Sequence, residues 1–448
     1  MVLKPHIAIL GAGESGVGAA LLAHKKGLKV FVSDKGTIQQ KYKNVLDSIG
    51  IKWEQGKHSE DIVLQANEII KSPGIPDKVD IVLKACSRGI PVISEIEFAA
   101  RYTQAKKICV TGSNGKTTTT LLIYHILKKA GYHVGLAGNI GQSFAGQVAQ
   151  KDFDYYVLEI SSFQLDGMYD FKADIAILLN ISPDHLDRYD NDFAQYAKAK
   201  FRILQNQTEN DFFIYWNEDP IIKKFIKTHN VKPRMIGFSE SENTSMGAYI
   251  KNNKSITINI KSEEFQMDLK DMVLSGKHNA YNSMASSIAA RLVDIRKEVI
   301  KQSLADFQNI EHRLEHVAMV RGVEFINDSK ATNINSSWYA LESINKPVVW
   351  IVGGLDKGNE YFQLNELVRT KVKAIVCLGN DNSRVMDAFY GMVENIVDTK
   401  SAEDAVKSAY FLAQPGDVVL LSPACASFDL FENFEDRGKQ FKKAVYDL

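Results

Sequence analysis

The residues best suited to chemistry in this chain form a short polar loop, TGSNGKTT, at positions 111–118. The loop follows an apolar run, 107–110, and leads into a segment with helical spacing, 118–130, that stops at Gly131. Glycines let the backbone wrap a phosphate chain, and the N–H groups at a helix start attract the anion. In such loops the lysine reaches the terminal phosphates and the next hydroxyl holds Mg²⁺. We therefore predict nucleotide-phosphate binding by Gly112, Ser113, Asn114, Gly115, Lys116, Thr117 and Thr118.

This loop is shorter than the common GxxxxGK(S/T) pattern, because Val110 stands where the first glycine would be. An ordinary strand–turn–helix corner is the alternative, and the Lys-Thr-Thr at the helix start favours phosphate binding over it. A GTP-binding protein is not indicated, since residues 345–348, NKPV, lack the aspartate of a guanine-reading motif.

A second glycine loop, Gly11-Ala12-Gly13-Glu14-Ser15-Gly16, follows the apolar run 6–10, and Asp34 ends the next run. The spacing is that of a dinucleotide-binding fingerprint. A lone GxGxxG is weak evidence, so two interpretations stay open: a dinucleotide site, or glycines that serve only tight packing.

Acidic and basic residues follow the other apolar runs. Glu159 ends the run 155–158, and Asp184-His185-Leu186-Asp187 follows the run 174–179. Carboxylate oxygens beside a phosphate loop are suitable ligands for Mg²⁺. A little further on, Lys198 and Lys200 lie in a segment with helical spacing, 197–202. For each of these side chains a solvated surface charge is the alternative.

Composition narrows the class of protein. The 448 residues suggest about three domains. Lys+Arg and Asp+Glu both number 54, which argues against nucleic-acid binding and against a basic membrane-binding surface. The four cysteines form no CxxC pair, as expected in a reducing compartment. The sequence shows neither a signal peptide nor an apolar stretch long enough to span a bilayer. We therefore predict a cytoplasmic protein.

Short apolar runs alternate with helical patterns along the whole chain, which predicts an α/β fold with parallel sheets. We expect three domains: a Rossmann-like domain over 1–94, a P-loop ATPase-like parallel sheet with extra antiparallel strands over 95–309, and a second Rossmann-like domain over 310–448. The antiparallel strands are expected within 211–275, where SITINI alternates polar and apolar residues. Ligands of such sheets bind beyond the carboxyl ends of the strands.

Several motifs together resemble the muramyl ligase and folylpolyglutamate synthase superfamily. They are TGSNGKT, GNIG at 138–141, DHLD at 184–187, SGKHNAYN at 275–282, EHRLE at 311–315 and NDSKATN at 327–333. SSFQL at 161–165 and the stretch 421–438 resemble the D-glutamate-adding branch of the muramyl ligases in particular. This resemblance implies an ATP-dependent, ADP-forming ligase of peptidoglycan precursor synthesis. Such an enzyme adds D-glutamate to UDP-N-acetylmuramoyl-L-alanine through an acyl phosphate, and we expect it to act as a monomer.

The resemblance also implies roles for individual residues. The catalytic set would be Lys116, Glu159, His185 and Lys200. Two Mg²⁺ ions would be held by Thr117, Glu159, His185 and a carbamylated Lys200, with Lys198 as the competing lysine. ATP would also contact Asn279, Asn282, Arg313 and Asp328. The UDP-linked substrate would contact Glu14, Ser15, Asp34, Ser72, Gly74, Asn139 and Ser161, and D-glutamate would contact Lys330, Thr332, Lys357, Ser427 and Phe434.

One feature points to a different branch. Residues 381–384, DNSR, are one residue away from the DNPR of the diaminopimelate-adding enzymes. The motif stands at an unexpected place, and 161–165 and 421–438 contradict that branch, so we interpret it as a coincidence. Another branch of the superfamily, a nucleotide-regulated binding module without catalysis, and an NAD-dependent oxidoreductase remain alternative hypotheses.

Overall fold

The computed structural model describes residues 6–184, 186–240, 246–261, 263–274, 276–307, 311–356 and 358–448. Two predicted site residues, His185 and Lys357, lie outside this set. The chain divides into two compact units, one of Met1–Met272 with Asn279–Asp306, the other of Val273–His278 with Phe307–Leu448. No helix in the described part combines the length and apolar character needed to cross a membrane.

The first sheet has five parallel strands in the order β3-β2-β1-β4-β5. The strands are β1 (His6–Leu10), β2 (Lys29–Asp34), β3 (Lys52–Gln55), β4 (Glu68–Lys71) and β5 (Val92–Ser94). The helices between and after them are α1 (Glu14–Lys25), α2 (Gln40–Ser48), α3 (Glu60–Val63), α4 (Asp80–Ser87) and α5 (Glu95–Ala100). The strand order reverses at β1, since β2 and β3 lie on one side of it and β4 and β5 on the other. The loops after β1 and β4 therefore flank the switch point, where parallel sheets bind ligands.

The second sheet belongs to the same unit and has nine strands in the order β14-β13-β12-β11-β10-β9-β6-β8-β7. Its strands are β6 (Lys106–Thr111), β7 (Val134–Gly138), β8 (Tyr155–Glu159), β9 (Ile175–Leu178), β10 (Phe212–Trp216), β11 (Arg234–Ser239), β12 (Gly247–Lys251), β13 (Ser255–Ile260) and β14 (Glu263–Asp268). Because β6 lies between β8 and β9, the loops that follow these three strands meet at one edge.

The helices of this part include three short 3₁₀ segments. They are α6 (Lys116–Lys129), α7 (Phe144–Gln150), α8 (Ser162–Asp166), η1 (Leu186–Tyr189), α9 (Phe193–Phe201), η2 (Arg202–Leu204), α10 (Pro220–Thr228), η3 (Leu269–Asp271), α11 (Lys277–Leu292) and α12 (Lys297–Asp306).

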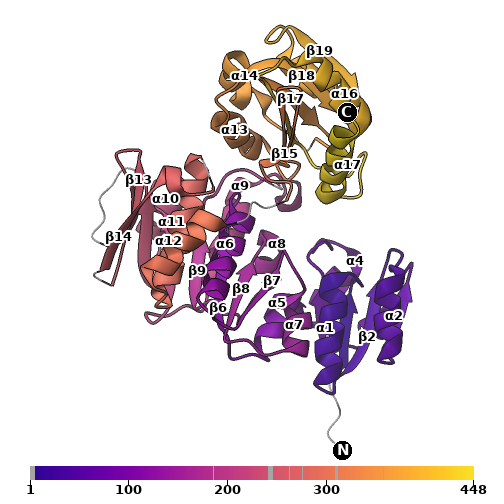
Figure 1. The fold of residues 1–448 in the computed structure, drawn as a ribbon. Helices are drawn as coiled ribbons and strands as arrows, with labels where there is room; N and C mark the ends of the chain where they lie inside the picture. The colour runs from indigo at the N-terminus through magenta and orange to yellow at the C-terminus, as the bar shows by residue number, and fades with distance from the viewer. Residues whose placement is uncertain are drawn as a thin grey trace, which may run out of the picture. The chain divides into compact units, whose positions relative to one another are not determined.

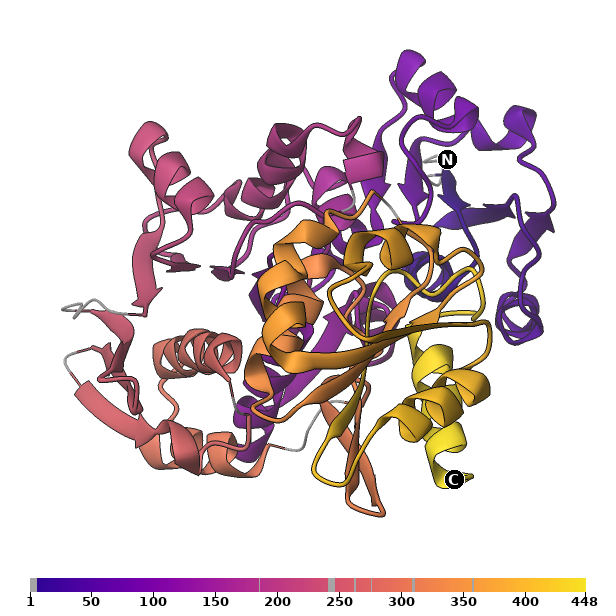
Figure 2. The same cartoon turned by 90° about the horizontal axis from the view of Figure 1, so that it is seen from above.

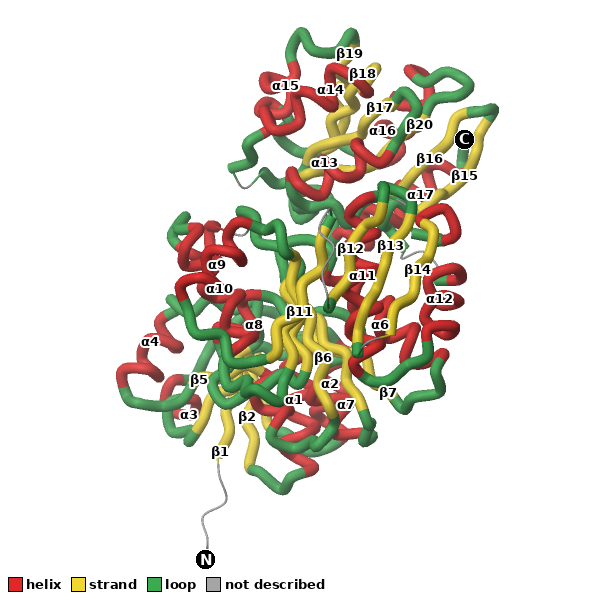
Figure 3. The backbone as a smooth tube through the Cα atoms, turned by 90° about the vertical axis from the view of Figure 1, so that its left-hand side faces the viewer, coloured by secondary structure: helices red, strands yellow, loops and turns green. Residues whose placement is uncertain are grey.

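The antiparallel strands predicted within 211–275 are present, but only in the second part of that segment. Strands β10 and β11 pair in parallel and continue the main sheet, and β12 is parallel to β11. Only the pairs within the β12-β13-β14 meander, whose strands lie side by side in Figure 3, are antiparallel. The reason is the connections: helix α10 crosses over between β10 and β11, whereas β12 and β13 are joined by a tight turn that reverses the chain.

The third sheet has six strands in the order β15-β16-β20-β17-β18-β19, and only β15 is antiparallel to its neighbour. Its residues are coloured orange to yellow in Figure 2. The strands are β15 (Glu315–Val320), β16 (Val323–Asn327), β17 (Val348–Gly353), β18 (Val372–Leu378), β19 (Asn395–Thr399) and β20 (Val418–Ala424). The helices are α13 (Ile334–Ser343), η4 (Tyr361–Leu364), α14 (Asn365–Lys371), α15 (Ser383–Phe389), α16 (Ala402–Leu412) and α17 (Phe434–Tyr446).

The first two sheets share a continuous apolar core, which includes Ile9 and Val32 from one and Phe144 and Leu158 from the other. Helices α1 and α7 pack side by side in this core (Figure 1). The contact is close because Gly18 has no side chain: a Cβ there would lie 1.8 Å from Ser143 Oγ. The two sheets therefore form one folded unit.

Gly18→Ala is expected to lower the free energy of unfolding by about 1–3 kcal/mol, because the new methyl group forces α1 and α7 apart. Gly237→Ala is a matched control, since the nearest atoms to a Cβ at Gly237 are 3.6 Å away, at ordinary contact distance. Urea denaturation of both variants measures the difference. Equal stability of the two variants would show that the α1–α7 contact adapts to an added methyl group.

Candidate functional site

The phosphate-type loop predicted from the sequence forms between β6 and α6. Gly115 caps the helix with a left-handed φ of +84°, and Lys116 is the first helical residue. The loop after β9 braces it: Asn180 Oδ1 accepts from the N–H of Asn114 at 2.8 Å, and Ser113 Oγ donates to Ser182 O at 2.8 Å. These hydrogen bonds hold the loop in one conformation, and a pre-organised loop loses little conformational entropy when a ligand binds.

Two lysines converge on one backbone oxygen in this loop. The carbonyl oxygen of Gly112 accepts from Lys116 Nζ at 2.8 Å and from Lys200 Nζ at 2.9 Å. The two nitrogens are therefore less than about 6 Å apart, and two positive charges at about 5 Å repel by roughly 3 kcal/mol at an effective dielectric constant near 20. The arrangement opposes a second positive charge on Lys200.

Burial acts on Lys200 in the same direction. Its side chain is only 2% exposed, and it lies over the ring of Tyr196, 4.7 Å from the ring centroid. Burial, and after it the positive charge of Lys116, holds the pKa of Lys200 well below its ordinary value. Lys198, the competing candidate, is exposed on another face of α9. The geometry thus brings Lys200, and not Lys198, to the phosphate-type loop.

Glu159 ends β8 beside this loop and is 1% exposed. Its Oε1 accepts from Asn139 Nδ2 at 2.8 Å, and its carbonyl oxygen accepts from Asn139 N at 2.8 Å. Its Oε2 is buried and has no hydrogen-bond partner among the described residues. A buried carboxylate oxygen left without a donor fits the ligand of a hard cation.

Of the other residues predicted to bind a metal ion near Glu159, the structure describes Thr117 but not His185. Thr117 is buried in the first turn of α6, and His185 lies outside the described residues. Within those residues, no group of three or more His, Cys, Asp or Glu side chains is arranged to hold a metal ion. Glu159 and Thr117 supply oxygen donors of the kind that Mg²⁺ takes, and Mg²⁺ at phosphates usually keeps water and phosphate ligands as well.

Helix α11 brings both predicted asparagines to the same place. Asn282 Oδ1 accepts from Thr119 Oγ1 at 3.2 Å, and its Nδ2 donates to Asn279 Oδ1 at 3.2 Å. Both side chains are buried. The structure thus joins the phosphate-type loop to a motif more than 160 positions later in the chain.

The first sheet presents its own loop at the point where the strand order reverses. The Asp34 carboxylate accepts from Ala12 N and from Gly36 N, both at 2.7 Å, and so ties the glycine loop to the end of β2. Gly11 has φ +91°, and a Cβ there would lie 2.6 Å from Ser72 Oγ. Glycine at this position therefore allows the loops after β1 and β4 to approach each other.

The other predicted residues of this unit have varied surroundings. Glu14 accepts from Tyr42 Oη and from Ser143 N, both at 3.3 Å, and so faces α7. Ser15 is half-buried in the first turn of α1, and Gly74 lies in the turn after β4. Ser161 forms a capping box with Gln164 at the start of α8. The structure thus gives Ser161 a local role in holding its helix as well as a place beside Glu159.

In the second unit, Asp328 is buried at the end of β16. Its Oδ2 accepts from Ser422 Oγ at 2.9 Å, and its Oδ1 accepts from Leu314 N at 3.2 Å. Burial raises the pKa of Asp328 to about 7, against the opposing effect of the positive charge of Arg313. Arg313, which precedes Leu314, therefore lies near Asp328, and the family resemblance assigns both residues to ATP.

The remaining residues predicted for the amino-acid substrate gather in the loops after β16 and β20. Lys330 Nζ lies 4.9 Å from the centroid of the Phe434 ring, and Phe434 begins α17. Ser427 is buried, and Thr332 is exposed. A cationic side chain over an aromatic face is held in place by the ring's quadrupole, so this pair can present a positive charge to an anion.

Comparison with known proteins now adds to the geometry. Residues 5–94 match the family model described as "Mur ligase MurD-like, N-terminal domain", 110–290 match "Mur ligase middle domain", and 312–425 match "Mur ligase, glutamate ligase domain". The chain belongs to the Mur ligase family. The family and the fold class predicted from the sequence are confirmed.

Two curated Mur ligases illustrate the likeness over the full length. Proteins of Bacteroides fragilis and Porphyromonas gingivalis, both named UDP-N-acetylmuramoylalanine–D-glutamate ligase, are each 54% identical to this chain. The first match covers 99% of this chain and 99% of the relative, and the second covers 100% and 99%.

Solved structures share the fold at low identity. The UDP-N-acetylmuramate-alanine ligase MurC of Thermotoga maritima matches with a TM-score of 0.64 at 17% identity, over 99% of both chains. A pseudomurein peptide ligase type C from Methanothermus fervidus matches with a TM-score of 0.64 at 19% identity, over 99% of this chain and 100% of the other. The three-sheet architecture is thus that of other Mur ligases.

The structure also reveals contacts that the sequence did not single out. Arg188 donates to the carbonyl oxygens of Pro73, Gly74 and Ile75 at 3.4 Å and lies 4.3 Å from the Phe163 ring centroid. It therefore braces the loop after β4 from the second sheet. The position of Arg188 directly after DHLD was the only sequence feature that could have drawn attention to it. That motif does not indicate that Arg188 contacts the loop after β4.

Glu95 is a second such residue. It is buried at the start of α5 and accepts from the N–H of Ala145 in the first turn of α7. Burial raises the pKa of Glu95 to about 7, and the nearby charge of Glu14 adds to the effect. Glu95 thus belongs to the contact between the first two sheets.

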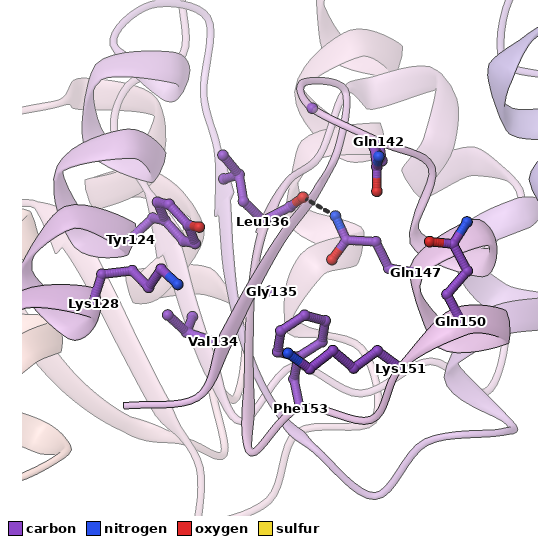
Figure 4. A pocket seen from close by; sticks show the side chains of 11 residues that line it. Tyr124, Lys128, Val134, Gly135, Leu136, Gln142, Gln147, Gln150, Lys151 and Phe153 are labelled. Atoms are coloured by element: carbon purple, nitrogen blue, oxygen red, sulfur yellow. Dashed lines mark hydrogen bonds between the residues drawn. The ribbon is translucent and has the colours of Figure 1, made fainter. Parts of the chain in front are cut away.

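A separate cavity of about 390 Å³ lies beside β7, the edge strand of the second sheet. Figure 4 shows Lys128 and Tyr124 on one side of the strand and Gln147, Gln150 and Lys151 on the other. The side chain of Gln147 donates to Leu136 O and so covers part of the open edge. None of the predicted site residues lines this cavity, so it is distinct from the phosphate-type loop.

Gly115→Ala is expected to destabilise the protein more than Gly131→Ala. Both glycines have nearly the same φ, +84° and +85°, so alanine meets similar backbone strain at each, about 1–3 kcal/mol. A Cβ at Gly115 would also lie 2.4 Å from Asn282 Oδ1, whereas nothing lies within 4 Å at Gly131. We expect a further loss of about 1–3 kcal/mol in the free energy of unfolding, measured by urea denaturation. Equal losses would mean that Asn282 moves aside freely.

Proposed function

We propose that this Mur ligase adds D-glutamate to UDP-N-acetylmuramoyl-L-alanine and converts ATP to ADP and phosphate, a step in peptidoglycan precursor synthesis. The observation that carries the proposal is identity of 54% over essentially the whole length to relatives that bear the name of this ligase. The phosphate-type loop with Lys116 supplies the chemical part of the argument, because an ATP-dependent ligase needs a cationic group at the transferred phosphate.

The reaction has two steps. The L-alanine carboxylate of the UDP-linked substrate attacks the γ-phosphate of ATP and forms an acyl phosphate, with ADP as the leaving group. The amine of D-glutamate then attacks the acyl carbon, and the tetrahedral intermediate collapses with loss of phosphate. Lys116, in the first turn of α6, stabilises the negative charge on the transferred phosphoryl group.

The residues near the loop fit a hard cation. Glu159, through its unpartnered Oε2, and Thr117 would hold Mg²⁺, together with His185. Magnesium would neutralise phosphate oxygens of ATP and of the acyl phosphate. The protein's own contribution is to fix the carboxylate of Glu159 through Asn139.

Carbamylation of Lys200 and a second Mg²⁺ are part of the proposal. A carbamate forms when a neutral amine attacks CO₂, and the product is an anionic group that can bind a metal ion. The burial and lowered pKa of Lys200 support this, because both favour the neutral amine.

We assign the three substrates to the three predicted domains, 1–94, 95–309 and 310–448. The loops after β1 and β4 would hold the UDP end through Ser15, Asp34, Ser72 and Gly74, with Glu14 beside them and with Asn139 and Ser161 nearer the reacting end. The loop after β6, with Asn279, Asn282, Arg313 and Asp328, would hold ATP. The loops after β16, β17 and β20 would hold D-glutamate through Lys330, Thr332, Lys357, Ser427 and Phe434. A cytoplasmic location and a monomeric state remain predictions.

The proposed function is tested by phosphate release from ATP in the presence of Mg²⁺, UDP-N-acetylmuramoyl-L-alanine and one amino acid at a time. We expect release with D-glutamate and none with L-lysine, diaminopimelate or L-glutamate. Release with diaminopimelate or L-lysine would keep the mechanism and refute the D-glutamate assignment. Tight ATP binding without release under any condition would favour a binding module.

Lys200→Met is expected to abolish ligase activity and yet to raise the unfolding temperature at pH 7 in CO₂-free buffer. The pKa of Lys200 is lowered in the folded state, so the unfolded chain binds more protons below the ordinary pKa of 10.5. Stability is therefore lost as the pH falls through the range between the ordinary and the lowered pKa, and methionine removes that loss. The difference in unfolding temperature between Lys200→Met and the wild type should shrink as the pH approaches 10.5. Lys198→Met, on the exposed face of α9, is the control and should change neither property.

A further inference from the structure

A single carboxylate organises the loop after β17 in the second unit. Asp356 Oδ1 accepts from Gly358 N at 2.7 Å and from Asn359 N at 3.0 Å, and its Oδ2 accepts from Tyr361 Oη at 2.9 Å. Asp356 Oδ1 also accepts from Arg384 Nη1 at 2.5 Å. The side chain of Asp356 is only 15% exposed. The carboxylate thus ties Gly358, Asn359, Tyr361 and Arg384 together.

The same loop is fastened to the loop after β20, which carries Ser427. Leu355 N donates to Ala426 O at 2.8 Å, and Asn359 Nδ2 donates to Ala424 O at 3.0 Å. Tyr361 Oη, which donates to Asp356, also lies 3.2 Å from Cys425 Sγ. Any displacement of Asp356 would therefore disturb the joined loops.

Arg384 comes from the DNSR segment, which the sequence left without a role. Asp381 is used locally: it accepts from the N–H and the hydroxyl of Ser383 at the start of α15. Arg384 instead reaches the loop after β17, where Nη1 meets Asp356 and Nη2 donates to Asn359 O at 3.1 Å. A guanidinium with two donors in a fixed plane is suited to hold a carboxylate and a carbonyl together.

We propose that Arg384 and Asp356 form a clamp that positions the loop after β17 against the loop around Ser427, and so sets the affinity for the amino-acid substrate. Arg384 is a positioning residue: both of its Nη atoms are engaged by the loop itself. The kinetic part of this inference rests on the proposed function, in which Lys357 and Ser427 bind D-glutamate. The structural part, that the clamp holds the loop, does not.

The kinetic test compares Arg384→Ala with Arg369→Ala, which removes an exposed arginine from α14 in the same unit. We expect Arg384→Ala to raise KM for D-glutamate about fivefold, since a partly exposed charge pair is worth up to about 1 kcal/mol, and to leave kcat and KM for ATP unchanged. Asp356→Asn should have a similar effect, and the double variant should add little to either single variant. If the two substitutions raise KM for D-glutamate additively in the double variant, or if kcat falls while KM is unchanged, the proposed clamp is refuted.

Limited trypsin digestion tests the clamp without any substrate. Trypsin cleaves after lysine, so the peptide bond between Lys357 and Gly358 reports on the loop directly, and mass spectrometry identifies the fragments. We expect faster cleavage at this bond in Arg384→Ala than in the wild type or Arg369→Ala, with unchanged unfolding temperatures. A raised KM without faster cleavage would mean that Arg384 contacts the substrate itself, which would overturn the positioning role. If the wild-type protein releases no phosphate with D-glutamate, the proposed function fails, and the digestion still decides whether the clamp exists.

Discussion

The candidate site at the second sheet is built around one backbone oxygen, the carbonyl oxygen of Gly112, which accepts hydrogen bonds from two lysines. Charge repulsion and burial both oppose a proton on Lys200. The fold tolerates this unfavourable placement because β6, β9 and α9 hold the residues around it, including Tyr196 and Ser113. Buried and electrostatically strained groups of this kind are typical of functional sites.

Strand order explains how residues far apart in the chain come together near that oxygen. β6 is flanked by β8 and β9, so Lys116, Glu159 and Asn180 follow three neighbouring parallel strands and lie at one edge. The third sheet uses the same device: β16, β20 and β17 are neighbours, and the loops after them carry Asp328, Ser427 and Asp356. In both sheets the candidate site residues lie beyond the carboxyl ends of the strands.

Loops placed in this way still need to be held, and the structure holds them with polar contacts. Arg188 braces the loop after β4, Asn180 braces the phosphate-type loop, and Asp356 with Arg384 braces the loop after β17. Each brace comes from a neighbouring loop or from the start of a helix. The side chains that we propose to bind ligands are thus supported by residues that need not touch the ligand.

The sequence by itself determined the local features: the strand–loop–helix around Lys116, the glycine loop before α1, and the succession of strands and helices that makes parallel sheets. These features depend on residues that are neighbours along the chain. The motifs by themselves also indicated the family. Tertiary structure decided what depends on distant partners. Strands β10 and β11 continue the parallel sheet because α10 crosses over between them, although their sequence suits either direction. Lys200 and Lys198 are equivalent in type, and only the packing of α9 selects the buried one, since side chains two residues apart on a helix point to different sides.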